Sequence, residues 1–92
     1  MLEHRWREGE NYLISTTTYA WVGTVVSVDH REVLLDPACR VYDTGRFADA
    51  LSNGLETLEA SELEPAPSKV LINRSAVVDG VLYAHKIPRE QK

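Results

Sequence analysis

The segment Thr16–Ala38 constrains the fold more than any other part of the chain, because two runs of β-forming residues flank a polar tetrapeptide. Thr, Tyr, Trp and Val dominate the first run, and these residues fit the pleated, half-buried surface of a sheet. The polar run Asp29–Glu32 predicts a tight turn, followed by a strand that returns from Val33. We expect Pro37 to end this second strand, since proline has no N–H to donate to a ladder. Gly23, inside the first strand, predicts a bend or bulge, as at the corner of a small barrel.

Shorter β-forming runs elsewhere in the chain predict further strands. Their apolar residues are bounded by turn residues, which is typical of short strands. The expected strands are Tyr12–Ile14, Cys39–Tyr42, Lys69–Asn73, Ala76–Val78 and Val81–Tyr83. The pair Asp79–Gly80 predicts a hairpin turn between the last two of them. The segment Leu55–Glu64 carries four glutamates, so we expect a solvated acidic face or loop; the alternative is a site for a metal or a cationic partner.

The clearest helix signal lies between Asp43 and Gly54. Asp43 or Thr44 is a good N-cap, because its side-chain oxygen can accept a hydrogen bond from the first turn. Asn53–Gly54 supplies the left-handed stop, so we expect a helix over Gly45–Ser52. Its apolar face is made of Phe47, Ala50 and Leu51. A helix of about two turns depends on tertiary packing rather than on propensity.

Length predicts one small domain over residues 1–92. A chain of this size buries only roughly two-thirds of its unfolded surface, so its core is modest. Residues 1–11 carry Trp6 and predict a loose arm, which packs on the barrel through Trp6 or reaches a neighbouring subunit. Residues 84–92 are basic and contain a proline. We expect an extended tail there, serving as a solubilising end, a strap over a neighbour or a cap on a pocket.

Charge and cysteine usage exclude several classes of protein. A net charge of −4 argues against general nucleic-acid binding, which needs a basic face. No apolar run approaches the length of a membrane span, and the first residues do not predict a secretory signal. The single Cys39 cannot form an internal disulfide, and three scattered histidines do not complete a zinc site around it. We therefore expect a cytoplasmic protein with no metal and no cofactor.

The sequence lacks the common motifs of catalysis. It has no glycine-rich phosphate loop, no paired-histidine metal motif and no Gly-x-Ser-x-Gly elbow, so we expect no enzyme and no catalytic residue. An anion site is better indicated at the start of the predicted helix. Thr44 and Gly45 would present backbone N–H groups there, and Arg46 adds a planar cation. The alternative is that Thr44 only caps the helix while Arg46 pairs with Asp43 or Asp49.

Aromatic residues and a second arginine complete the candidate ligand site. Tyr19 or Trp21, if exposed on the strand, could stack on a base. The alternative is that Trp21 belongs to the core, which is common for a tryptophan in a small barrel. Arg74 directly follows a predicted strand and is a further candidate for binding an anion. Its alternative is a surface ion pair of little energetic consequence.

Trp21–Asp29 followed by Val33–Ala38 resembles the central hairpin of Sm-like small barrels, with Gly-x-Val before the turn and alternating aliphatic residues after it. The resemblance implies a five-strand barrel that oligomerises through its edge strands. The chain lacks the N-terminal helix and the nucleotide-binding loops of Sm proteins, so the resemblance does not imply RNA binding.

The chain as a whole resembles a group of small phage and prophage proteins of similar length and unknown function. The matching segments include Tyr19–Gly23, Asp43–Phe47, Asn73–Arg74 and Pro88–Lys92. The resemblance implies a phage origin. Small phage proteins are often virion parts, inhibitors of a host protein, or oligomeric sponges that sequester nucleotide-derived immune signals.

These observations predict a mainly β protein, a small bent β-barrel of about five to six strands with one short α-helix, that forms a homo-oligomer. The expected function is non-enzymatic binding of a small anionic, nucleotide-derived ligand. The protein would act as an anti-defence signal sponge in the cytoplasm of an infected or lysogenic bacterial host. The alternative is a phage structural or host-protein-binding inhibitor module that needs no small molecule.

Overall fold

We analysed a computed structural model of the chain, which describes residues 5–57 and 59–92. The described residues form a single sheet of six strands, one short α-helix and two 3-10 turns, which confirms the mainly β prediction. The strands are β1 Asn11–Thr16, β2 Ala20–Val28, β3 Glu32–Asp43, β4 Glu62–Pro65, β5 Val70–Asn73 and β6 Val77–Leu82. The helical elements are α1 Phe47–Asn53, η1 Leu55–Thr57 and η2 Arg74–Ala76. Within the described ranges, no helix is both long and apolar enough to span a bilayer.

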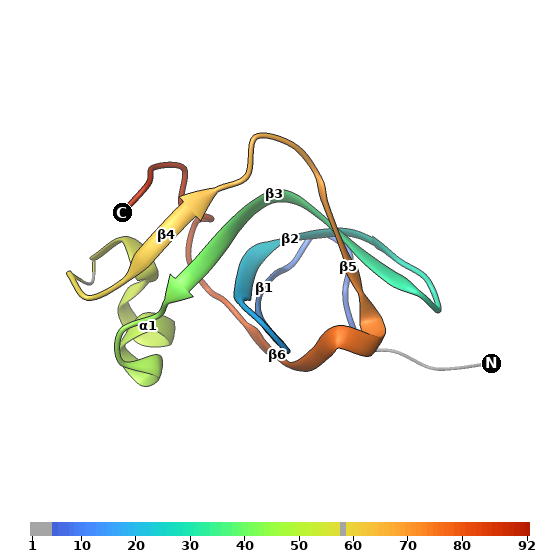
Figure 1. Cartoon of the computed structure of the whole chain (residues 1–92), viewed down its shortest axis with the longest axis horizontal. Coiled ribbons are helices and arrows are strands. Elements are labelled where there is room, and N and C mark those ends of the chain that lie inside the picture. The colour runs from blue at the N-terminus through green and yellow to red at the C-terminus, as the bar shows by residue number, and fades with distance from the viewer. Residues whose placement is uncertain (1–4, 58) are drawn as a thin grey trace.

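The sheet is antiparallel and strongly bent. Its order is β4-β3-β2-β1-β6, and β5 also pairs with β3. Strands β5 and β6 therefore lie at opposite edges of the sheet, yet only the three residues of η2 join them. The sheet must curl until these two edges approach one another, as Figure 1 shows. No ladder joins β5 to β6 in the described part of the chain, so the fold is a curled open sheet rather than a closed barrel.

The β2–β3 hairpin matches its prediction except at its start and at the proline. The first run was expected to be one strand from Thr16, but residues 17–19 form a turn between β1 and β2, which pair with each other. The Asp29 carboxylate accepts hydrogen bonds from the N–H groups of Arg31 and Glu32, at 2.7 Å each, and so fixes the predicted turn. The register shifts after Gly23, where a Cβ would lie 2.9 Å from the Pro37 carbonyl oxygen. The prediction that Pro37 ends the strand is wrong. Pro37 falls in the irregular part of the ladder, where its missing N–H costs no regular bond, and β3 continues through the run expected as a separate strand.

The C-terminal half differs from the sequence prediction at two strands. Asp79–Gly80 is not a turn, because β6 runs through it and both residues pair with β1, whose register with β6 shifts only at Val78. Gly80 serves close packing instead, since a Cβ there would lie 2.5 Å from the Trp6 ring. In the acidic segment, Leu63 is 1% exposed and belongs to β4, which pairs with β3. A strand thus occupies part of the expected loop.

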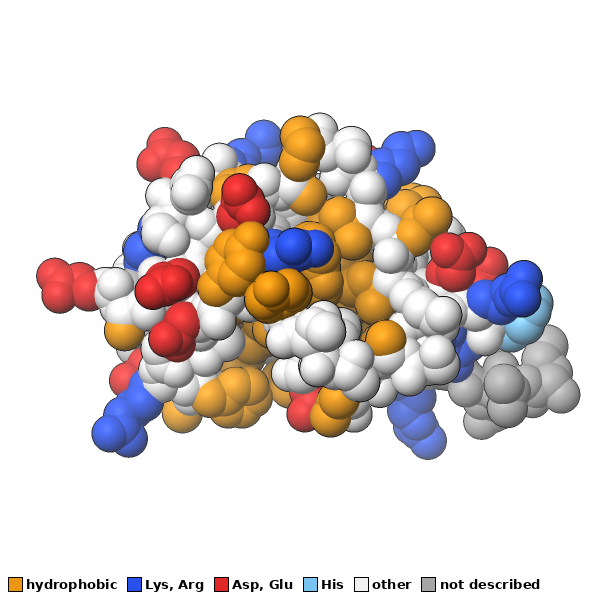
Figure 2. Space-filling view, viewed as in Figure 1, with side chains coloured by type: hydrophobic (Ala, Val, Ile, Leu, Met, Phe, Trp, Pro, Cys, Tyr) orange, Lys and Arg blue, Asp and Glu red, His pale blue; other side chains and the backbone are white. Residues whose placement is uncertain are grey.

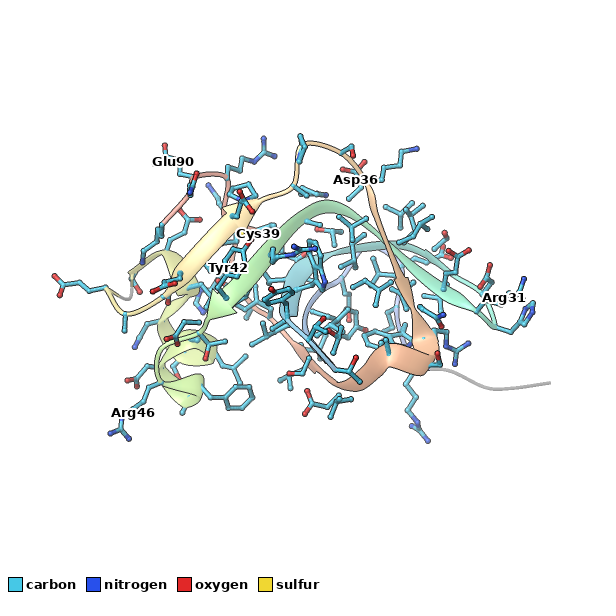
Figure 3. The ribbon with its side chains drawn as sticks, in the orientation of Figure 1. Arg31, Asp36, Cys39, Tyr42, Arg46 and Glu90 are labelled. Atoms are coloured by element: carbon cyan, nitrogen blue, oxygen red, sulfur yellow. The ribbon has the colours of Figure 1, made fainter. Side chains whose placement is uncertain are left out.

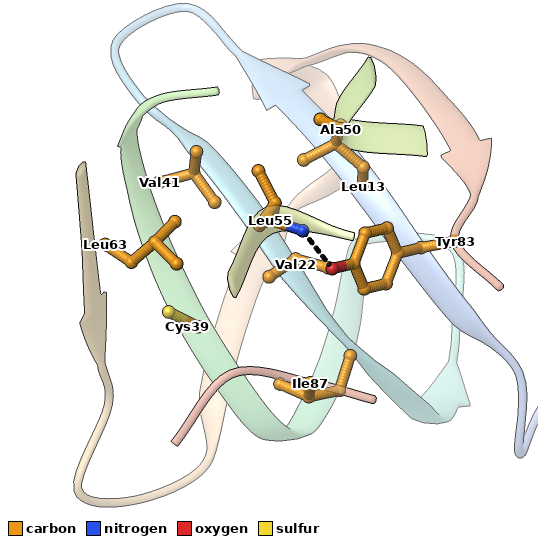
Figure 4. Close-up of a cluster of buried hydrophobic side chains, with 9 residues drawn as sticks. All are labelled: Leu13, Val22, Cys39, Val41, Ala50, Leu55, Leu63, Tyr83 and Ile87. Atoms are coloured by element: carbon orange, nitrogen blue, oxygen red, sulfur yellow. Dashed lines mark hydrogen bonds between the residues drawn. The ribbon is translucent and has the colours of Figure 1, made fainter. Parts of the chain in front are cut away.

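Alternating side chains of the central strands enter two separate apolar clusters, one on each face of the sheet. The first cluster is Leu13, Val22, Cys39, Val41, Ala50, Leu55, Leu63, Tyr83 and Ile87. It lies under α1, η1, β4 and the C-terminal segment, and Figure 4 shows its side chains meeting between these elements. The second cluster is Tyr12, Ile14, Val25, Val33, Leu35, Ala38 and Ile72, on the concave side of the curled sheet. Covering both faces explains how so short a chain builds an adequate core.

Both terminal segments pack on the sheet of their own chain. Trp6 lies edge-on against Tyr12, with ring centroids 5.0 Å apart, as expected for an arm that docks through Trp6. The predicted arm residues 1–4 lie outside the described residues. The C-terminal tail is more than a solubilising end, because Ile87 and Pro88 are buried. The backbones of Lys92 and Leu63 exchange two hydrogen bonds of 2.8 and 2.9 Å, so the tail borders β4 like a further strand.

Candidate functional site

Four side chains, Tyr19, Trp21, Arg40 and Tyr42, form the most distinctive group at the surface of the protein, in which the tyrosines are exposed and Trp21 and Arg40 are half-buried. We call them the aromatic surface. The β2–β3 register places Trp21 directly opposite Arg40, so both side chains lie on one face of the sheet. Tyr19 and Tyr42 are each 45% exposed, whereas Trp21 also packs against the second apolar cluster, as the alternative of a core tryptophan predicted in part. Figure 2 shows hydrophobic side chains gathered over the middle of this face, with a Lys or Arg side chain among them.

The Arg40 guanidinium lies over two aromatic rings. Its central carbon is 4.6 Å from the Trp21 ring centroid and 5.0 Å from that of Tyr19. Tyr19 in turn meets Tyr42 edge-on, with centroids 5.3 Å apart. Cation–π contacts of this kind hold a planar cation flat while its edge stays available for hydrogen bonds. The arrangement presents one oriented cation between π-faces.

Arg40 also carries an unsatisfied polar atom. Its Nε is buried and has no hydrogen-bond partner among the described residues. Buried donors without an acceptor are rare and cost free energy, so such an atom calls for an explanation. An acceptor supplied by a bound molecule would satisfy this donor. Glu64 is the cross-strand neighbour of Arg40 on β4, but its carboxylate accepts from the Tyr42 hydroxyl at 2.8 Å.

The Tyr42 hydroxyl connects the cation and the carboxylate. Its hydrogen bond to Glu64 raises the pKa of Tyr42, and the neighbouring Arg40 guanidinium opposes that effect. Tyr42 therefore stays protonated at neutral pH and keeps donating to Glu64. Glu64 is thus engaged by Tyr42, while the Arg40 Nε has no acceptor among the described residues.

The turn between β1 and β2 places Tyr19. The Thr16 backbone N–H donates to the Tyr19 carbonyl at 3.1 Å. The Thr16 hydroxyl donates to the same carbonyl and accepts from the Tyr19 N–H at 3.2 Å. Three contacts between residues 16 and 19 close this turn, so the exposed ring of Tyr19 stands on a fixed backbone.

The helix start differs from the predicted anion site. Helix α1 begins at Phe47, its N-cap is Arg46, and no side chain caps it, so neither Asp43 nor Thr44 plays the predicted role. The Gly45 N–H donates to the Asp43 carboxylate at 2.8 Å, which places an acid of the chain where an anion was expected. Figure 3 shows Arg46 projecting from this end of the molecule, away from the labelled Tyr42. A helix of seven residues that carries the acidic Asp49 in its first turn offers a poor anion site.

Arg74 lies apart from the other predicted site residues. It begins η2, and its Nη1 donates to the Asp29 carbonyl at 2.6 Å, which ties η2 to the β2–β3 turn. This hydrogen bond explains the position of the Arg74 side chain. It differs from the surface ion pair that was the alternative considered for Arg74 from the sequence. Of the six predicted residues, only Tyr19 and Trp21 lie together, and the structure adds Arg40 and Tyr42 to them. The other four predicted residues are not part of this group: Thr44, Gly45, Arg46 and Arg74.

Two shallow depressions flank the C-terminal segment, with volumes of about 540 and 680 Å³. The larger one is lined by both acidic and basic side chains, Glu56, Glu90, Lys86 and Arg89 among them, so it favours neither sign of charge. Within the described ranges, His, Cys, Asp and Glu side chains form no group of three or more that could hold a metal ion. The aromatic surface remains the arrangement with the clearest ligand chemistry.

Comparison with known proteins identifies no matching family, no related curated protein and no solved structure of similar fold. The resemblances to Sm-like barrels and to small phage proteins therefore remain predictions, and the function has to be argued from the geometry.

Proposed function

We propose that this protein is a non-enzymatic binding protein that takes a small anionic, nucleotide-derived ligand on the aromatic surface. The observation that carries the proposal is the Arg40 guanidinium stacked over Tyr19 and Trp21, with a buried Nε that lacks an acceptor. In the phage setting suggested by the sequence resemblance, such a protein acts as a sponge for an immune signal in the host cytoplasm.

Each part of the aromatic surface fits one part of a nucleotide. A base stacks on an aromatic ring with roughly 1–3 kcal/mol per contact, whatever its identity. The two exposed tyrosines, Tyr19 and Tyr42, offer such rings at the solvent side of the surface. A phosphate accepts from the planar fork of an arginine, often through two parallel bonds. Arg40 supplies that fork next to the rings, on a protein whose net charge of −4 would otherwise repel anions.

Titration calorimetry of the purified protein against linear and cyclic nucleotides tests this proposal. Replacing Arg40 by lysine keeps the charge and removes the planar fork, so we expect at least about tenfold weaker binding. Arg46→Ala is the matched control, since Arg46 is an exposed arginine away from the aromatic surface, and it should leave affinity unchanged. A panel in which no nucleotide binds, or an Arg46 variant that weakens binding as much as the Arg40 variant, would overturn the proposal.

A protein-binding module without a small molecule is the second candidate. Leu71 on β5 and Val78 and Leu82 on β6 are each at least 60% exposed, which favours contact with another polypeptide. A host enzyme or a virion component would then be the partner. Thermal unfolding in the presence of nucleotides separates the two candidates, because a ligand that binds only the folded state raises the melting temperature.

A further inference from the structure

Strand β6 ends the sheet with one side unpaired. Its only neighbour in the strand order is β1, and no other described backbone pairs with its outer side. At the opposite end of the sheet the edge strand β4 has a backbone partner, because Lys92 pairs with Leu63. The C-terminal residues therefore cover the β4 edge, whereas β6, like β5, has no second strand partner among the described residues. Exposed edges are usually guarded by lysine, proline or bulges. Strand β6 has no lysine or proline and carries Asp79 as its one charged residue, and its register with β1 shifts only at Val78, near its start.

The hydrogen-bonding groups of Gly80 and Leu82 point outward from β6. The Tyr83 N–H donates to the Asn11 carbonyl of the β1 side. In an antiparallel ladder, residues alternate between bonding to the neighbour and pointing away from it. Counting back from Tyr83 along the printed register, Val81 bonds toward β1, while Gly80 and Leu82 present their N–H and C=O groups to the open side.

The side chains of this edge are arranged symmetrically about Gly80. Val78 is 66% exposed and Leu82 is 61% exposed, and each lies two residues from Gly80. When two copies of β6 pair antiparallel around Gly80, Val78 of each copy lies opposite Leu82 of the other. Asp79 then lies opposite Val81, so the two Asp79 carboxylates are not directly opposed. Trp6 packs over the face of Gly80, where a side chain would otherwise stand.

We propose that β6 pairs with β6 of a second copy of this chain, antiparallel and centred on Gly80, to form a two-fold symmetric dimer. A two-fold interface requires a surface that is complementary to itself. The hydrogen-bond phase of Gly80 and Leu82, the apolar side chains and the charge of β6 meet that requirement, and the register shift at Val78 falls at the end of the pairing. The pairing joins the two sheets into one continuous sheet. The proposal does not depend on ligand binding, because the aromatic surface lies on β2, on β3 and in the turn between β1 and β2.

Sedimentation equilibrium over a concentration series tests the dimer. The wild type should show a monomer–dimer equilibrium. The V78K/L82K variant places like charges opposite one another at both ends of the pairing, and should weaken the dimer by about tenfold or more. The V78K/L82E variant places opposite charges there instead, and should associate more tightly than V78K/L82K. Leu71→Lys is the matched control, because Leu71 is 60% exposed on β5, and it should associate as the wild type does.

Far-UV circular dichroism and thermal unfolding check that each variant keeps its fold, as expected for changes at side chains that are mostly exposed. A wild type that stays monomeric throughout the series would overturn the proposal. So would V78K/L82K dimers as tight as those of the wild type, or a V78K/L82E variant no tighter than V78K/L82K. A loss of association in Leu71→Lys equal to that in V78K/L82K would move the interface away from β6.

Discussion

Replacing Tyr83 by phenylalanine isolates one hydrogen bond inside the first apolar cluster. The Tyr83 hydroxyl accepts from the Leu55 N–H at 2.8 Å, as the dashed line in Figure 4 marks. Tyr83 is 3% exposed and Leu55 is 0% exposed, so water cannot replace the lost acceptor. The phenylalanine ring still fills the site, and the main change is a buried donor without a partner. That change costs about 1–3 kcal/mol of unfolding free energy.

Urea unfolding, followed by far-UV circular dichroism, measures this cost. For a domain of this size, a loss of 1 kcal/mol lowers the melting temperature by roughly 4–8 °C, so a second measurement is available. Tyr42→Phe is the matched control, because it removes the same phenolic oxygen at the surface, where the hydroxyl donates to Glu64. Its effect should stay within about 0.5 kcal/mol. Equal stabilities of Tyr83→Phe and the wild type would refute the reasoning that the Leu55 N–H depends on this acceptor.

Two further predictions concern the same cluster. Ile87→Ala should lower the unfolding free energy by about 2–5 kcal/mol, since the Ile87 side chain is only 6% exposed. Val78→Ala, at an exposed site, is the control and should change the unfolding free energy little. Equal effects of the two changes in urea unfolding would show that the tail does not contribute to the core. Burial raises the pKa of the Cys39 thiol from 9.0 to about 11, so the thiol ionises more readily after unfolding. Stability present below pH 9 should therefore be lost as the pH rises toward 11, more steeply in the wild type than in Cys39→Ala, and parallel pH profiles of the two proteins would contradict this.

The sequence predicted the elements whose signals are local. The β2–β3 turn depends on the side chain of Asp29 and the N–H groups that follow it within three residues. The bend at Gly23 likewise follows from the missing side chain. The Asp79–Gly80 pair carries an equally strong local turn signal, but pairing with β1, more than sixty residues earlier in the chain, holds it extended. Tertiary contacts override local preference where the partner strand is distant in sequence.

The residues of the candidate site likewise divide into those with a local sequence signal and those without one. Tyr19 and Trp21 were predicted from their residue type and strand context, and the structure places both on one surface. Arg40 was missed, because nothing near it in the sequence marks it as a ligand residue. The alternation of β3 does place Arg40 and Tyr42 on the face opposite Cys39 and Val41, and this was the available signal. Its significance depends on the register with Trp21, which the sequence alone does not specify.

The aromatic surface and the β6 edge are two features that the packing of the described residues leaves uncovered. The C-terminal segment and α1 close one face of the sheet, and Trp6 closes part of the other. Because the two features lie on different strands, a ligand and a second copy can bind without competing for the same atoms. Arg40→Lys should then leave the dimer intact, and V78K/L82K should leave nucleotide affinity intact. A change of both properties in either variant would mean that ligand binding and association are coupled, and the two proposals would have to be replaced by a single site shared between copies.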